Sequence, residues 1–125
     1  MSQTELEAKR TEAMQIMSEW LFVLRSALNV TQEQIAFSVG MSRQTYSALE
    51  LNKKKMTWNA FLSLFLFFML NEKSRNLLSK KPGYIFTVFI LLDVNAENLD
   101  INGLLSADKE KPIDSIEEIF KGKFS

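Results

Sequence analysis

Residues 42–48, SRQTYSA, gather side chains that can hydrogen-bond to the edges of DNA bases. Arginine can pair with O6 and N7 of guanine, and glutamine with N6 and N7 of adenine. The segment supplies both in Arg43 and Gln44, with serines on either side, and it carries no acidic residue. These residue types favour nucleic-acid recognition.

Catalysis has much less support in the 125 residues. Histidine and cysteine are absent, so the most common general base, the most common zinc ligand and the thiol nucleophile are all missing. We therefore expect no enzymatic activity, no metal and no cofactor. Residues 1–12 are polar and charged rather than a secretion signal, which predicts a cytoplasmic protein.

A short helix with strong end signals precedes this polar segment. Thr31 is a good N-cap, and Gln34 stands three residues later, where its side chain can complete a capping box. This pattern predicts a helix over residues 31–39. Gly40 tolerates a positive φ and ends that helix.

The polar segment itself is expected to lie on a second helix, over residues 42–51. Ser42 is its N-cap, and Asn52 can adopt the left-handed conformation that ends it. Two short helices joined by a tight turn form a helix-turn-helix, whose second helix reads DNA. The expected inner residues of the pair are Ile35, Ala36, Val39, Tyr46 and Leu49.

Longer apolar helices flank this unit. Residues 4–28 carry apolar side chains in steps of three and four, which is the helical period. The two stripes are Met14, Met17, Leu21, Leu24 and Leu28, and Ile16, Trp20, Val23 and Ala27. We interpret them as core packing, with a dimer seam as the alternative. Thr57 caps a helix over residues 58–70, which is almost wholly apolar and should be buried on more than one side.

The chain after residue 70 is less regular. Residues 71–81 resemble a short amphipathic helix with Leu77 and Leu78 inward. Residues 84–92, YIFTVFILL, fit a buried helix or a buried strand equally well by periodicity. We favour a helix because no second strand is evident, and a strand paired across a dimer is the alternative.

The net charge of zero conceals an uneven distribution. Residues 1–82 hold 11 basic and 7 acidic side chains, whereas residues 83–125 hold 4 basic and 8 acidic ones. We therefore expect a DNA-binding domain over residues 1–81, including the extended first helix. Residues 82–125 are expected to form an apolar dimerisation segment followed by an acidic tail.

The stretch from residue 25 to residue 68 resembles the Cro/C1-type, or Xre, family of helix-turn-helix regulators. It carries the family pattern in TQEQIA at residues 31–36 and GMS at residues 40–42. Arg25 and Glu50 match an arginine–glutamate pair of the family, and Asn52 replaces its usual glycine. The resemblance implies an all-α, lambda-repressor-like helix-turn-helix bundle, here with an extended first helix and an additional C-terminal segment.

The resemblance also implies a DNA-binding surface. Gln32 would face phosphate, Arg43 and Gln44 would enter the major groove, and residues 52–54 would hold the DNA backbone. The serines would contact phosphate or base edges, and the alanine a thymine methyl. The complete set is Gln32, Ser42, Arg43, Gln44, Ser47, Ala48, Asn52, Lys53 and Lys54. The implied function is a repressor that binds a palindromic site in double-stranded DNA as a homodimer, and no effector is identified.

Two other functions compete with this one. A protein-interaction module on the same scaffold, such as an antirepressor or an antitoxin-like protein, would suit the acidic tail and the large apolar share. A membrane-peripheral protein could use residues 61–70 and 84–92. We expect no membrane binding, however, because basic residues do not flank a clean amphipathic face there.

Overall fold

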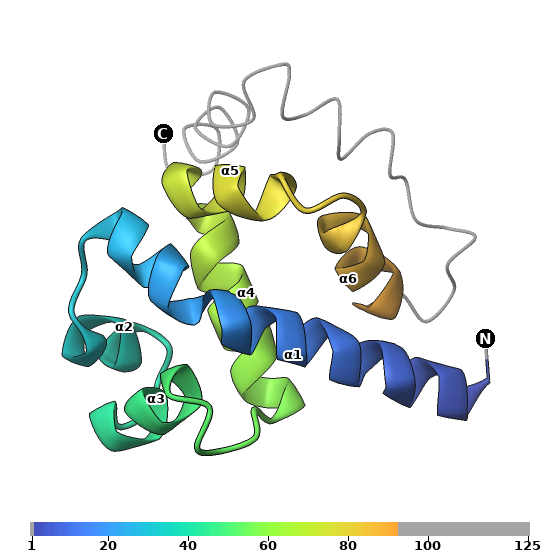
Figure 1. Ribbon diagram of the computed structural model, residues 1–125, viewed down its shortest axis with the longest axis horizontal. Coiled ribbons are helices and arrows are strands. Elements are labelled where there is room, and N and C mark those ends of the chain that lie inside the picture. Colours follow the sequence, from blue (N-terminus) through green and yellow to red (C-terminus); the bar gives the residue numbers. More distant parts are fainter. Residues whose placement is uncertain (1, 93–125) are drawn as a thin grey trace, which may run out of the picture. The chain divides into compact units, whose positions relative to one another are not determined.

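A computed structural model describes residues 2–92, and every regular element in this range is an α-helix (Figure 1). The helices lie in one compact unit, Met1–Leu91. Their bounds are α1 Gln3–Leu28, α2 Gln32–Ser38, α3 Arg43–Glu50, α4 Trp58–Leu70, α5 Glu72–Ser79 and α6 Tyr84–Leu92. The expected acidic tail lies outside the described residues. The all-α prediction is confirmed.

Side-chain caps fix where the helices begin. The Thr31 hydroxyl accepts from the Gln34 backbone N–H at 3.0 Å, and the Gln34 side chain accepts from the Thr31 N–H at 2.9 Å. Ser42 and Thr57 cap α3 and α4 by accepting from the N–H groups of residues 45 and 60. Each helix starts one residue after its cap because the cap keeps extended backbone angles.

Left-handed residues lie before the helix-turn-helix and in its turn. Asn29 ends α1 with a φ of 54°, and Gly40 follows α2 with a φ of 75°. A side chain at Gly40 would meet no neighbour within 4 Å, so its backbone angle rather than crowding favours glycine there. The turn is closed by the Met41 N–H, which donates to the Ala36 carbonyl at 3.0 Å.

The core forms where α1 packs against α3, α4 and α5, and α2 packs against α3. Figure 1 shows α1 crossing α4 near the middle of the bundle. The buried side chains are mainly Ala13, Met17, Leu21 and Leu24 of α1, Ile35 and Ala36 of α2, Tyr46 and Leu49 of α3, and Phe61, Leu64, Phe65 and Phe68 of α4. The first predicted stripe of α1 thus faces the core.

Within residues 2–92, α4 is not covered on all sides, and its burial at a subunit interface stays a prediction. One side of α4 packs in the core, but Leu66 and Leu70 on the other side are 60% and 72% exposed. The second stripe of α1 is also only partly covered, because Val23 is 50% exposed. The neighbours of α4 in this part of the chain, α1, α5 and α6, leave Leu66 and Leu70 uncovered.

Residues 84–92 form a helix, so the alternative of a strand is wrong. Tyr84 anchors the start of α6, because its buried hydroxyl donates to the Ala13 carbonyl of α1 at 2.9 Å. Two edge-to-face contacts join α6 to α4, from Phe65 to Tyr84 and to Phe89, with ring centroids 6.4 and 6.2 Å apart. Of the helices in residues 2–92, none is both long and apolar enough to cross a membrane.

We expect Tyr84→Phe to lower the free energy of unfolding by about 1 kcal/mol, the usual net value of a buried hydrogen bond. The ring stays in place, so only the bond to Ala13 is lost. Chemical denaturation followed by circular dichroism measures the change. A matched control is Tyr84→Leu, which also removes the aromatic contact with Phe65 and should cost more. Equal stability of wild type and Tyr84→Phe would show that the bond contributes nothing.

Candidate nucleic-acid interface

The outer side of α3 is a polar surface backed by a buried inner side. Arg43 and Gln44 are exposed, whereas Tyr46 and Leu49 are 0% and 1% exposed. The helical period places residues 44, 47, 48 and 51 on the side away from residues 46 and 49, and Arg43 is exposed in the first turn of α3. A surface concavity of about 400 Å³ lies over the outer side, lined by Arg43, Gln44, Ser47, Ala48, Leu51 and Lys53. Five of the nine predicted site residues therefore lie together.

Ser42 has a structural task at the beginning of α3. Its hydroxyl accepts a hydrogen bond from the Thr45 backbone N–H at 3.0 Å and donates one to the Thr45 hydroxyl at 2.9 Å. These bonds orient the first turn, in which Arg43 and Gln44 follow directly. Contact between Ser42 and DNA stays a prediction.

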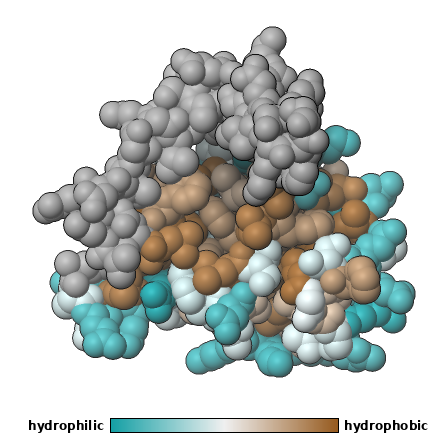
Figure 2. All heavy atoms as spheres, turned by 180° about the vertical axis from the view of Figure 1, so that it is seen from behind, coloured by the Kyte–Doolittle hydropathy of each residue, from teal (hydrophilic) through white to brown (hydrophobic). Residues whose placement is uncertain are grey.

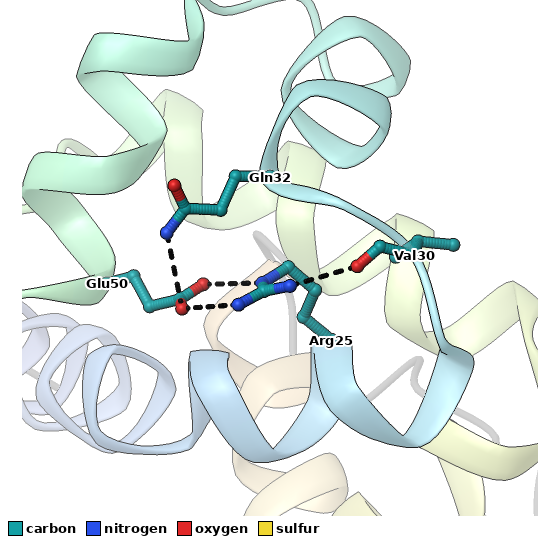
Figure 3. A network of polar contacts seen from close by, with 4 residues as sticks. All are labelled: Arg25, Val30, Gln32 and Glu50. Carbon is teal, nitrogen blue, oxygen red and sulfur yellow. Dashed lines mark hydrogen bonds and ion pairs between the residues drawn. The ribbon is translucent and has the colours of Figure 1, made fainter.

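The last residue of α3, Glu50, is held by side chains from two other helices, Arg25 of α1 and Gln32 of α2 (Figure 3). Arg25 of α1 donates to both carboxylate oxygens, from Nε and from a terminal nitrogen, each at 2.9 Å. Its other terminal nitrogen donates to the Val30 carbonyl at 3.0 Å, and the Gln32 side chain donates to Glu50 at 3.4 Å. The predicted structural pair of Arg25 and Glu50 is thus present, with side chains only 17% and 6% exposed.

Gln32 lies at the start of α2, as expected, but its amide points toward Glu50 (Figure 3). The side chain is half-buried, and one of its two N–H donors is used by this bond. A glutamine amide has two N–H donors, so the bond to Glu50 leaves the second N–H of Gln32 for another partner. The prediction that Gln32 contacts phosphate therefore rests on this second N–H.

The loop after α3 projects three lysines into solvent. Asn52 adopts a φ of 58°, as predicted for the residue that ends α3. The Asn52 N–H donates to the Leu49 carbonyl at 3.1 Å and the Lys53 N–H to the Ala48 carbonyl at 2.8 Å. This pair of bonds is a Schellman motif, which satisfies the last carbonyls of the helix. Residues 53–55 are all exposed, so a positive charge lies beside the end of α3.

Comparison with protein families agrees with this geometry. A family model described as helix-turn-helix, of the Cro/C1 type, matches residues 23–57. Residues 23–57 form a helix-turn-helix of the Cro/C1, or Xre, type. Searches of curated proteins and of solved structures each find no match to the chain. The matched range holds α2, α3 and the Arg25–Glu50 pair, so the fold is the all-α, lambda-repressor-like type, and the protein is a DNA-binding helix-turn-helix regulator.

At the Arg25–Glu50 pair of this Xre-type helix-turn-helix, burial and hydrogen bonding have opposite effects on the pKa of each group. Burial alone would raise the pKa of the Glu50 carboxyl, but the hydrogen bonds from Arg25 outweigh it and hold that pKa below its ordinary 4.5. The hydrogen bond to Glu50 also raises the pKa of Arg25. Both groups therefore stay charged at neutral pH, so the Arg25–Glu50 ion pair that joins α3 to α1 is fully ionised.

Leu51 lies in the candidate interface but is not among the residues predicted from the sequence. It is 59% exposed and lines the same concavity as Arg43 and Gln44. The sequence could have predicted this position, because residues 44, 47, 48 and 51 follow the helical spacing of three and four and so share one side of the helix. An exposed apolar side chain at this place can contact a sugar or a thymine methyl.

Proposed function

We propose that the protein is a repressor that binds a palindromic operator as a homodimer in the cytoplasm. The observation that carries the proposal is the exposed, acid-free outer side of α3, with Arg43 and Gln44 in its first turn. One short helix reads few base pairs, so specificity at useful levels needs two half-sites and two subunits. A dimer on its operator regulates by occupying the DNA.

Each site residue has a proposed task in that complex. Arg43 and Gln44 read base edges in the major groove, where bidentate contacts discriminate between bases. Ala48 and Leu51 supply apolar contacts along the same concavity. The second N–H of Gln32, the two serines and residues 52–54 contact phosphate and sugar, and they set the register of α3 in the groove.

The experiment that tests the proposal is fluorescence anisotropy with random duplex DNA across a salt series. Phosphate contacts release bound cations, so we expect binding that weakens steeply as salt rises. In the variant Lys53→Gln/Lys54→Gln we expect weaker binding to every duplex and a salt slope reduced by about 2, because each lysine contributes about 1. The logarithm of the dissociation constant against the logarithm of salt gives this slope.

The matched control removes two exposed lysines, one in α5 and one directly after it, in Lys73→Gln/Lys80→Gln. It makes the same change in net charge away from α3, so its slope should stay close to that of wild type. An equal loss in both variants would mean that charge alone, and not the loop after α3, attracts DNA. Absence of binding by wild type at low salt would favour the protein-interaction module.

A further inference from the structure

A second surface, free of charge, extends over α4 and α6. Neither helix contains a charged residue. Leu66 and Leu70 of α4 are 60% and 72% exposed, and Phe86 and Leu92 of α6 are 44% and 47% exposed. The partly buried apolar side chains Leu62, Met69, Ile85 and Phe89 belong to the same two helices. We call these residues the α4–α6 face.

The two helices of this face adjoin, so its side chains form one surface. Phe65 of α4 contacts the rings of both Tyr84 and Phe89 of α6. Figure 2 shows a broad, nearly continuous apolar area on the side of the molecule opposite to the view of Figure 1. Polar residues border it below. A continuous exposed apolar area with a polar border is typical of a protein–protein contact.

The other exposed apolar side chains of residues 2–92 are scattered. Phe22 and Val23 lie on α1, and the Phe22 ring is covered by the Arg25 guanidinium at 5.6 Å. Phe37 is alone on α2, and Leu51 belongs to the concavity of α3. Exposed apolar residues that occur singly are ordinary on protein surfaces. The α4–α6 face therefore stands apart from them.

We propose that the α4–α6 face binds the same face of a second copy of this chain, which makes it the dimer interface. This inference rests on the proposed function, which requires two subunits on one operator. A partner with charges in its contact surface would bury them opposite α4 and α6 without a counter-charge. A second copy presents an equally uncharged face, and a two-fold axis matches such a face with itself.

The position of the face is compatible with DNA binding. It uses the side of α4 that points away from the core, whereas α3 packs against α1 and α2. Figure 1 shows α3 and α6 on different sides of α1. The outer side of α3 thus remains free in each subunit, and one dimer can present two recognition helices to two half-sites.

The first test uses the absence of native cysteine, because a single introduced thiol then has no other partner in the chain. Leu66→Cys, Leu70→Cys and Phe86→Cys are made separately in the full chain and oxidised. Residues near a two-fold axis lie close to their own copies, so we expect a covalent dimer of twice 14.4 kDa from the position nearest the axis. Phe37→Cys, which is 86% exposed and off the face, is the control and should stay uncrosslinked.

The second test places charge in the interface. Light scattering of wild type should give a dimer, and Leu66→Glu/Phe86→Glu should raise its dissociation constant about a hundredfold or more, because the new carboxylates would be buried without partners. Phe37→Glu makes the same kind of change elsewhere and should leave the dimer intact. Circular dichroism checks that both variants remain helical.

The outcomes separate this inference from the proposed function. Wild type that is monomeric at high micromolar concentration overturns the interface, and it favours an occupant such as residues 93–125 of the same chain. A dimer that survives Leu66→Glu/Phe86→Glu, or that crosslinks equally through Phe37→Cys, overturns it as well. If the dimer dissociates in these variants but wild type binds no duplex DNA, the interface is supported and the proposal of an operator is overturned.

Discussion

Arg43→Ala/Gln44→Ala is expected to bind random duplex DNA almost as well as wild type and to lose its preference for the operator. Each bidentate base contact contributes about 1–3 kcal/mol of discrimination, so the two together give a preference of roughly a hundredfold or more. The phosphate contacts proposed for the loop after α3 are unchanged. Selection of an operator with wild type, followed by competition between operator and random duplex at fixed salt, measures the effect.

The control for this prediction is Lys9→Ala/Gln15→Ala on α1. It also removes one positive charge and one amide, and both positions are exposed. It should keep the full preference for the operator. If Arg43→Ala/Gln44→Ala kept that preference too, sequence would be read elsewhere, either by Ala48 and Leu51 or through the shape of the DNA.

Loss of the Arg25–Glu50 pair is expected to have the largest effect on stability of any single polar substitution. Glu50→Ala leaves the Arg25 guanidinium largely buried and without its carboxylate, which typically costs about 3 kcal/mol. For a domain of this size such a loss lowers the melting temperature by about 10–20 °C. Thermal unfolding followed by circular dichroism is the measurement.

An exposed carboxylate supplies the comparison. Glu19 accepts a hydrogen bond from Gln15 on the surface of α1, and Glu19→Ala should cost less than about 0.5 kcal/mol. Arg25→Ala should destabilise about as much as Glu50→Ala, and Arg25→Ala/Glu50→Ala much less than the sum of the two. Additive losses would show that the two side chains act independently.

The same pair also predicts acid sensitivity. The folded-state pKa of Glu50 lies below its ordinary 4.5, so the unfolded chain takes up the proton first as pH falls. The contribution of the pair is therefore complete above the ordinary pKa and is lost as pH falls through the lower folded pKa. In the Glu50→Ala variant this part of the pH dependence should be missing.

The helix-turn-helix could be predicted because its signals are local. Thr31 with Gln34, Gly40 and Ser42 each specify a boundary within four residues, and the structure shows a helix start or turn at each one. The Arg25–Glu50 contact spans 25 residues, and only the family resemblance made it predictable. Physical chemistry alone does not show which arginine meets which carboxylate.

The features that could not be predicted depend on the neighbours of each helix. Composition showed that α4 is apolar on all sides, but not that Leu66 and Leu70 would lack a covering element. Periodicity could not distinguish a helix from a strand over residues 84–92. The bond from Gln32 to Glu50, 18 residues further on, could not be predicted from local signals, and contact between Gln32 and phosphate stays a prediction.

The inner and outer sides of α3 are independent of one another, and this has an evolutionary consequence. In the part of the chain that the structure describes, the hydrogen bonds that hold α3 run through Ser42 and Glu50, and its packing runs through Tyr46 and Leu49. Substitutions on the exposed outer side typically change stability by less than about 0.5 kcal/mol. Descendants of this chain can therefore acquire new operators through a few codon changes at the outer positions, with no compensating mutation in the core.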